Sequence, residues 1–210
     1  MPLETEHGIP SHWIAYIGCD DTDATCAKAT ELGGKVCVPP TDIPGIGRFA
    51  VVEDPNGAIF SPFTHAGEVP PEPAMPIPGT FCWNEMMAKD TAKAIEFYTS
   101  LFGWTTEASE MDLGGGNKGV YTIFMQEGNM RAGCMALPPE AAAAGAPSHW
   151  MAYIYVEDVD ADFAKAKELG ATPYVPPMDI PGIGRFCVLA DPTMAAFALY
   201  KGDPSMNPES

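Results

Sequence analysis

The sequence predicts an α+β protein built from three modules that share the element order β-α-β-β-β. Ser11–Thr64 recurs without a gap as Ser148–Lys201, and roughly 30 of the 54 aligned positions are identical, which marks an internal duplication. Between the two copies, residues 78–138 show the same order of strand and helix patterns with a different sequence. The three modules therefore span roughly 11–64, 78–138 and 148–202.

The second copy of the duplicated module shows the expected elements clearly. His149–Val156 is apolar and rich in β-forming residues, which predicts a strand, and Asp158–Leu169 has the pattern of a helix. Three more strands follow. Pro176-Pro177 should end the first of them, and Pro/Gly turns should separate the others. These strands are expected at Ala171–Val175, Arg185–Ala190 and Ala195–Tyr200.

The central module begins with an apolar strand, Phe81–Met87, followed by a helix at Thr91–Phe102. Asp90 is a good N-cap for this helix, and Gly103 stands where a C-cap glycine is expected. Its later strands are expected at Trp104–Glu107, Val120–Gln126 and Arg131–Leu137, with a flexible Gly114–Asn117 turn as a candidate lid.

Two linkers join the modules. Gly67–Pro78 is Pro-rich and should be an extended spacer, which indicates a domain boundary. Pro138–Pro147 is short and Ala-rich, so it should tie the second and third modules closely. We therefore expect an unpaired module at 1–66, a linker at 67–77 and a domain of two modules at 78–210.

Composition narrows the possible partners. A net charge of −17 argues against nucleic-acid binding, which needs clustered Lys and Arg. No apolar run reaches the ~18 residues of a membrane span, and the first residues lack the pattern of a secretory signal. The six cysteines are scattered without a CxxC pair, as in cytoplasmic proteins with reduced thiols.

Two motifs carry a resemblance to a known family. They are F-x-W-N-E-M-x-x-x-D…A-x-x-F-Y-x-x-x-F-G-W in the central module and H-W…D-I-P-G-I-G-R-F…D-P in both copies. The chain resembles the vicinal oxygen chelate superfamily, which includes glyoxalase I, bleomycin-resistance proteins and extradiol dioxygenases, and within it the branch with tandem glyoxalase-like domains. The resemblance implies that modules two and three pair into an open, cupped, eight-stranded mixed sheet around a ligand cavity.

The first module has no counterpart to pair with in this chain, whereas tandem members of the branch have four modules. Its exposed sheet edge and apolar face would be a liability if left bare. We therefore expect it to pair with its counterpart in a second copy, giving a homodimer with two-fold symmetry. The alternative is a shortened version of a four-module protein whose first module is loosely held.

In metal-using members, a His stands about seven residues before the Asp that precedes the helix, and a carboxylate stands on the last strand. Here these positions hold poor ligands for a divalent ion: Trp83, Met151, Ile14, Ser61 and Ala198. The resemblance therefore implies no metal cofactor at the usual site, while a divalent metal at an atypical site stays open.

Glu85 is the carboxylate on which a catalytic role is most readily placed. Period-two alternation puts it on one strand face with Phe81, Trp83 and Met87, and the resemblance implies that this face looks into the cup. Burial would raise its pKa and suit it to general-base chemistry or to holding a cation. The alternative is a structural bond to a pocket arginine, either Arg185 or Arg131.

The candidates for ligand contact are the other residues expected to face the cup or stand at its rim. Arg185 follows a rigid Pro/Gly turn, where it could bind an anionic substrate group or tie down the turn. His149, like His12 in the first copy, either lines the pocket mouth or only begins a strand. The full set is Trp83, Met87, Tyr121, Phe124, His149, Met151, Tyr153 and Arg185.

Three functions remain open from the sequence. The first is binding of a small molecule without the usual metal, as in bleomycin-resistance proteins, with the acidic charge favouring cationic compounds. The second is a lyase, isomerase or dioxygenase that uses either a metal at an unusual place or Glu85 as its base. The third is a non-catalytic assembly protein whose cup is filled by its own side chains.

Overall fold

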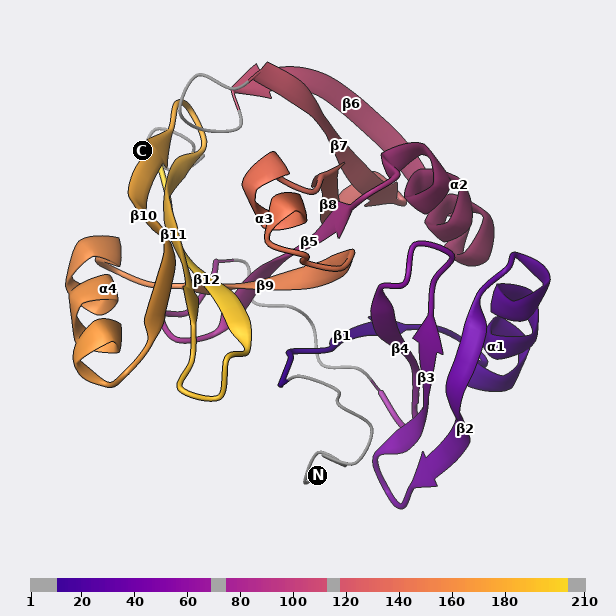
Figure 1. Cartoon of the computed structure of the whole chain (residues 1–210). Coiled ribbons are helices and arrows are strands. Elements are labelled where there is room, and N and C mark those ends of the chain that lie inside the picture. Colours follow the sequence, from indigo (N-terminus) through magenta and orange to yellow (C-terminus); the bar gives the residue numbers. More distant parts are fainter. Residues whose placement is uncertain (1–10, 69–74, 113–117, 204–210) are drawn as a thin grey trace.

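A computed structural model describes residues 11–68, 75–112 and 118–203, and two β-sheets account for its strands. The larger sheet has eight strands in the order β10-β11-β12-β9-β5-β8-β7-β6, and the smaller has four in the order β1-β4-β3-β2. Both parallel and antiparallel neighbours occur in each sheet (Figure 1). The predicted fold is therefore confirmed: modules two and three share one open mixed sheet, and module one forms its own.

Each module has the predicted order of one strand, one helix and three strands. Module one comprises β1 (Ala15–Gly18), α1 (Thr22–Glu31), β2 (Lys35–Ile43), β3 (Gly47–Glu53) and β4 (Ile59–His65). Module two comprises β5 (Phe81–Ala88), α2 (Thr91–Phe102), β6 (Thr105–Asp112), β7 (Lys118–Gln126) and β8 (Asn129–Ala136). Module three comprises β9 (His149–Tyr155), α4 (Val159–Glu168), β10 (Thr172–Ile180), β11 (Gly184–Ala190) and β12 (Ala196–Gly202).

Capping residues mark the ends of the long helices. Asp21, Asp90 and Asp158 cap α1, α2 and α4, each accepting a hydrogen bond from a backbone N–H three residues further on. Gly103 ends α2 in the left-handed conformation, at φ 70°. The caps expected at Asp90 and Gly103 are thus present.

The double prolines do not stop their strands, contrary to the expectation for Pro176-Pro177. β10 continues through them to Ile180, and β2 continues through Pro39-Pro40, in both cases with irregular register against the neighbouring strand. Both strands lie at a sheet edge, where a residue without an N–H loses no ladder partner. The prolines also discourage further pairing along these edges.

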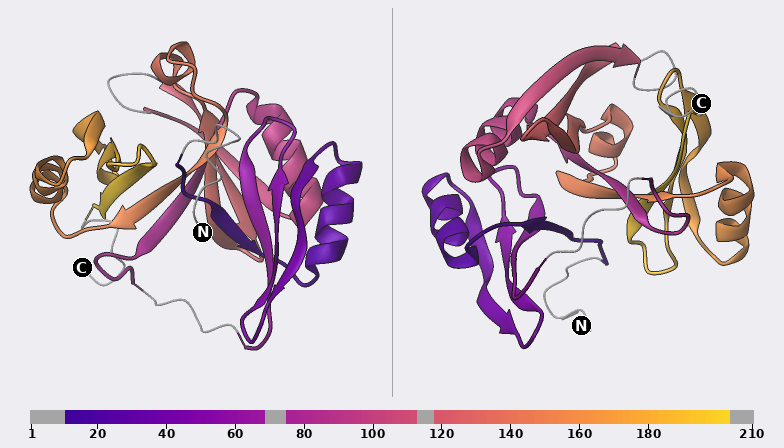
Figure 2. Two further views of the ribbon diagram at one scale, coloured as in Figure 1. Left: turned by 60° about the horizontal axis from the view of Figure 1, so that its bottom comes forward. Right: turned by 180° about the vertical axis from the view of Figure 1, so that it is seen from behind.

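One core joins all three modules, because module one packs its helix-covered face against α2 (Figure 2). Its buried residues include Phe60 from module one, Tyr98 from module two and Trp150 from module three. A second core lies on the opposite face of the eight-stranded sheet, and a third lies under α4. Within the described residues, no helix is long and apolar enough to cross a membrane.

Candidate ligand site

The centre of the eight-stranded sheet is formed by β5 and β9, the first strands of modules two and three, which run antiparallel. Their register sets Glu85 opposite Met151 and Met87 opposite His149. Cross-strand partners share a face, so these side chains lie on the concave side of the sheet. Met87, Met151 and Tyr153 are buried there in the second core, and they form what we call the cup floor together with Glu85 and Trp83.

Glu85 is a buried carboxyl on this floor, only 5% exposed. The Tyr153 hydroxyl donates a hydrogen bond to its Oε1 at 3.0 Å, and Tyr121 is a second donor. Burial raises the pKa of Glu85 above its usual range, and the two tyrosine hydrogen bonds oppose that rise only in part. The hydrogen-bond partners of Glu85 are thus the phenols of Tyr153 and Tyr121. The sequence analysis had offered a pocket arginine as the structural partner.

Tyr121 reaches Glu85 across an intervening strand. β8 lies between β5 and β7, and its Gly133 stands beside Glu85 in the register. A Cβ built on Gly133 would meet the Tyr121 hydroxyl and lie 2.6 Å from its Cζ. The hydroxyl also accepts a hydrogen bond from Trp83 Nε1 at 3.0 Å. Gly133 therefore makes the Trp83–Tyr121–Glu85–Tyr153 chain of hydrogen bonds possible, although the sequence analysis did not single it out.

The edge of the cup is more open and adds a second acid. On β6, Glu107 stands opposite Ile123 and Ser109 stands opposite Tyr121, and both are exposed. Because Tyr121 faces the cup, its cross-strand partners share that face. Such a surface, with a buried carboxyl at the floor and another at the rim, favours a cation or a hydrogen-bond donor over an anion.

The linker between modules two and three occupies part of the concave side. It contains a five-residue helix, α3 (Pro139–Ala143), which the sequence analysis did not predict. Figure 1 shows α3 on the concave side of the eight-stranded sheet. Leu137, Ala141 and Ala146 pack against the second core, so the linker covers the part of the floor near Met87 and Met151.

His149 stands at the beginning of β9 and is half-buried. Its Nδ1 lies 2.9 Å from the Pro147 carbonyl oxygen, so one ring nitrogen is engaged with the linker. The ring is therefore placed at the linker end of the floor, beside Met87 in the register.

Two aromatic residues lie on the other face. Phe124 is fully buried in the first core, with ring contacts to Tyr98 at 5.9 Å and Trp104 at 5.4 Å, so it does not line the cup. Its distance of three residues from Tyr121 turns it to the opposite side of β7. Phe81 pairs with Ile154 beyond a register shift in β5 and contacts Trp13, so alternation fails before Trp83.

Arg185 does not reach the cup either. Its Nε and Nη2 donate to the two carboxylate oxygens of Asp160 on α4, and its Nη1 donates to Asp179 at 3.0 Å. Arg48 makes the same bonds to Asp23 and Asp42 in module one. The duplicated arginine thus clamps a helix to strand β10 in module three and to strand β2 in module one, where the alternative expected was a bond to its own turn.

The positions of the usual metal ligands carry side chains that do not fit a divalent ion. On the floor, Trp83 donates its only polar hydrogen to Tyr121, Met151 is packed among apolar groups, and Ala198 has no donor atom. Among the described residues, no group of three or more His, Cys, Asp or Glu could hold a metal. The Gly114–Asn117 turn, expected as a lid, lies outside the described residues.

Comparisons with known proteins agree with this architecture. A family model described as the Glyoxalase/Bleomycin resistance protein/Dioxygenase superfamily matches residues 2–61 and 82–199. CFP32 of Mycobacterium tuberculosis (strain CDC 1551 / Oshkosh), whose name marks it as a candidate glyoxylase, is 35% identical over 97% of this chain and 75% of its own length. The anthracycline biosynthesis protein DauV of Streptomyces sp. (strain C5) is 31% identical over 95% of this chain and 69% of its own.

Solved structures show the same fold at low sequence identity. A Mn(II)-bound glyoxalase from Novosphingobium aromaticivorans aligns with a TM-score of 0.55 and 16% identity, over 88% of this chain and 61% of that one. A variant of homoprotocatechuate 2,3-dioxygenase from B. fuscum aligns with a TM-score of 0.55 and 14% identity, over 93% of this chain and 57% of that one. At these identities the likeness concerns the fold alone.

Proposed function

We propose that this chain, which belongs to the glyoxalase/bleomycin resistance protein/dioxygenase superfamily, binds a small molecule on its cup floor. The observation that carries the proposal is the buried Glu85 carboxyl, held by Tyr153 and Tyr121 among apolar side chains. Burying a carboxyl costs free energy that its hydrogen bonds offset only in part, and ligand pockets combine apolar walls with a few such polar groups.

The proposed ligand has an apolar or aromatic body and a cationic or hydrogen-bond-donating group that reaches Glu85. The exposed Glu107 at the rim and the net charge of −17 both favour a cation. The relative named for anthracycline biosynthesis supports including flat aromatic compounds among those tested.

A thermal-shift screen of cationic aromatic compounds against the full chain tests the proposal, because a ligand that binds only the native state raises its stability. Glu85→Gln should weaken binding of a hit about tenfold or more, because an amide of the same shape cannot ionise to pair with the cation. Tyr153→Phe should weaken it less, and Tyr16→Phe, at the matching position in module one, should leave it unchanged. Equal affinity in wild type and Glu85→Gln would refute the site.

The proposed mode of binding needs no metal at the family's usual position. Trp83, Met151 and Ala198 in place of ligands support this, since none can coordinate a hard divalent ion. Elemental analysis of the purified protein tests it: stoichiometric zinc, nickel, iron or manganese that survives chelation would contradict it.

An enzymatic role is the second candidate, favoured by the raised pKa of Glu85. A carboxyl whose pKa is moved toward neutrality is a better general base, and its two phenol donors would steady the conjugate acid and base. Turnover of a bound hit that is lost in Glu85→Gln would establish this role in place of simple binding. A third possibility, an assembly protein with a filled cup, draws support from the packing of α3 on the floor.

We also propose that two copies associate through module one. β1 is an edge strand, whereas its counterpart β9 pairs with β5. Tyr16 is 57% exposed but its counterpart Tyr153 is 9% exposed, which leaves an apolar half-cup uncovered. Pairing of β1 with its copy would give a two-fold dimer.

Light scattering after size-exclusion chromatography tests the dimer. Tyr16→Asp should convert it to a monomer, while Tyr174→Asp, a change at an equally exposed tyrosine on β10, should not. A wild-type protein that is monomeric both at high concentration and after 100-fold dilution would refute the dimer.

We also propose that the protein acts in the cytoplasm. Its six cysteines are all free thiols, which supports a reducing compartment.

A further inference from the structure

Module one docks helix α2 on a surface made of six residues. Lys28 Nζ donates to the Leu101 carbonyl oxygen at 3.1 Å, in the last turn of α2. The Phe60 ring meets Tyr98 at 5.5 Å, and the Asp54 Oδ2 atom accepts a hydrogen bond from the Tyr98 hydroxyl at 3.0 Å. We call this set the α1 docking surface: Lys28, Ala29, Leu32, Asp54, Pro55 and Phe60.

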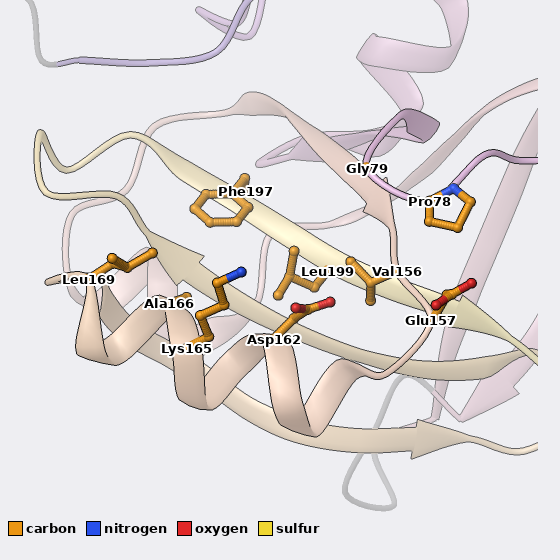
Figure 3. Close-up of a pocket in the computed structure, with 10 residues that line it drawn as sticks. All are labelled: Pro78, Gly79, Val156, Glu157, Asp162, Lys165, Ala166, Leu169, Phe197 and Leu199. Carbon is orange, nitrogen blue, oxygen red and sulfur yellow. The ribbon is translucent and has the colours of Figure 1, made fainter.

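The same six residue types recur in module three. They form the α4 docking surface: Lys165, Ala166, Leu169, Asp191, Pro192 and Phe197. Four of them line or border a hollow of about 370 Å³ between α4 and β12, with Pro78 and Gly79 on its far wall (Figure 3). Within the described residues, no helix lies in this hollow, and Leu169 is 70% exposed where Leu32 is half-buried.

The Asp191 carboxylate is held as Asp54 is held. Its Oδ1 accepts the N–H groups of Thr193 and Ala195, as the Oδ1 of Asp54 accepts those of Asn56 and Ala58. In module one this leaves Oδ2 to receive the Tyr98 hydroxyl. Among the described residues, Oδ2 of Asp191 accepts no hydrogen bond, so the acceptor for an incoming tyrosine is already oriented.

We infer that the α4 docking surface binds the C-terminal half of a helix that repeats the α2 pattern Phe-Tyr-x-x-Leu-Phe, presented by a further βαβββ module outside these 210 residues. The incoming tyrosine bonds Asp191, its last-turn carbonyl bonds Lys165, and its aromatic rings cover Phe197. α2 is the one segment of this sequence with the pattern, and it already lies on the α1 docking surface. The occupant is therefore not a segment of residues 1–210 that keeps its own place in this fold.

One difference between the two surfaces sets the limits of this binding. Asn56 exchanges two hydrogen bonds with the backbone of Asp90, at the beginning of α2, and Thr193 replaces it in module three. The contacts that persist are those to the last two turns of the helix and a carbonyl at Pro192, whose counterpart at Pro55 accepts a hydrogen bond from Lys93 Nζ at 3.0 Å. Binding should therefore be weaker than the intramolecular docking of α2, which also benefits from its tether.

The test uses the full chain and a fluorescent peptide that copies residues 88–105, with a photo-reactive benzoylphenylalanine in place of Phe102. Saturable binding is expected, with cross-links to α4 or β12. Because a peptide of this length is only marginally helical in water, millimolar to high-micromolar affinity is expected. Lys165→Glu and Leu169→Asp should each weaken binding about tenfold, because a hot-spot contact is lost.

Two matched controls make the test decisive. Lys167→Glu makes the same charge change on α4 at an exposed lysine outside the surface, and it should leave affinity unchanged. A peptide with Phe in place of its Tyr should bind more weakly, because the bond to Asp191 is missing. Cross-links confined to α1, equal binding by Lys165→Glu, or no saturation would each overturn the inference. Dimers of the chain alone that cross-link α2 of one copy to α4 of the other would overturn the assignment to a further module, because the occupant would then be α2 itself.

Discussion

The Glu85 carboxyl lies in an environment that favours its neutral form. Burial penalises its charge, and the phenols of Tyr121 and Tyr153 compensate that penalty only in part. The two tyrosines respond in turn: burial and the nearby carboxyl raise their pKa values. The buried Glu85 carboxyl thus lowers the stability of the folded protein, and such locally destabilising groups are common at functional sites.

This arrangement predicts how stability depends on pH. Because the pKa of Glu85 is raised in the folded state, the native protein binds more protons than the unfolded chain above pH ~4.5, so the free energy of unfolding falls as pH rises through the folded pKa. Glu85→Gln should remove this loss and raise stability more at pH 8 than at pH 4.5. Urea unfolding at both pH values measures it, and an equal gain at the two would show that Glu85 titrates normally.

Gly133 provides a second prediction at this scale. Gly133→Ala should break the hydrogen bond between Trp83 and Tyr121, because the new methyl group overlaps the Tyr121 ring. Such overpacking costs about 1–3 kcal/mol of unfolding free energy. Gly18→Ala is the control, since that strand glycine has nothing within 4 Å of its added Cβ and should change stability by less than about 0.5 kcal/mol. Similar losses in both variants would argue against the crossing of β8 by Tyr121.

Alternation along one strand predicted the concave position of Glu85, because its β5 neighbours from Trp83 to Met87 keep a regular period of two. The same rule, applied to β7, puts Tyr121 and Phe124 on opposite faces of the sheet. The prediction that both side chains line the cup was therefore inconsistent with the rule. The contact of Tyr121 with Glu85 could not be predicted from the sequence. It depends on the register of three strands and on the absence of a side chain at Gly133.

At the scale of elements, the duplication allows one turn to be compared in two sequences. The turn before the last strand contains Gly57 in module one and Met194 in module three. Both residues have positive φ, 89° and 74° respectively. Glycine adopts this conformation freely, whereas a residue with a Cβ is strained there by about 1–2 kcal/mol.

Met194→Gly should therefore stabilise the protein, by about 0.5–1 kcal/mol once the greater freedom of the unfolded chain is subtracted. Met194 is 52% exposed, so little packing is lost with its side chain. Gly57→Ala should destabilise by about 1 kcal/mol for the converse reason. Thermal and urea unfolding measure both changes, and a loss of stability in Met194→Gly would show that the Met194 side chain contributes more than its backbone costs.

Elements that depend on their place in a sheet were harder to predict than elements defined by local pattern. Asp90 and Gly103 marked the ends of α2, because capping is a local effect. β2 and β10 continue through two prolines, because each lies at an edge that no sequence window reveals. α3 was missed because a five-residue helix has no periodicity to detect.

At the scale of the whole molecule, one hydroxyl connects all three modules. The Tyr98 hydroxyl of module two donates to Asp54 of module one at 3.0 Å and accepts from Trp150 Nε1 of module three at 2.9 Å. All three side chains are buried, and burial raises the pKa of Asp54 against the hydrogen bonds that favour its charge. This buried chain fixes how the small sheet sits against the large one.

The repeat also shows where local sequence stops determining structure. Phe60 and Phe197 occupy the same place in two duplicated modules, yet Phe60 is fully buried and Phe197 is half-buried. The difference comes from α2, which covers one surface and leaves the other open. The fold of each module could therefore be predicted from its sequence, but the docking of module one could not.

Tyr98→Phe should weaken the junction between the modules. It leaves Asp54 with a buried carboxylate oxygen and Trp150 with a buried N–H that have each lost their partner, which costs about 1–3 kcal/mol of unfolding free energy. The loss should be larger at pH 8 than at pH 4, because removal of a donor raises the pKa of Asp54 further and its ionised form is the one left uncompensated. Tyr200→Phe is the matched control, since among the residues that the structure describes its hydroxyl bonds only the Ile183 carbonyl oxygen of the same module. Hydrogen exchange separates the two: faster exchange in α1 and β4 is expected for Tyr98→Phe alone. Equal, pH-independent losses in the two variants, without faster exchange in module one, would show that apolar packing around Phe60 holds the junction without this hydrogen-bond chain.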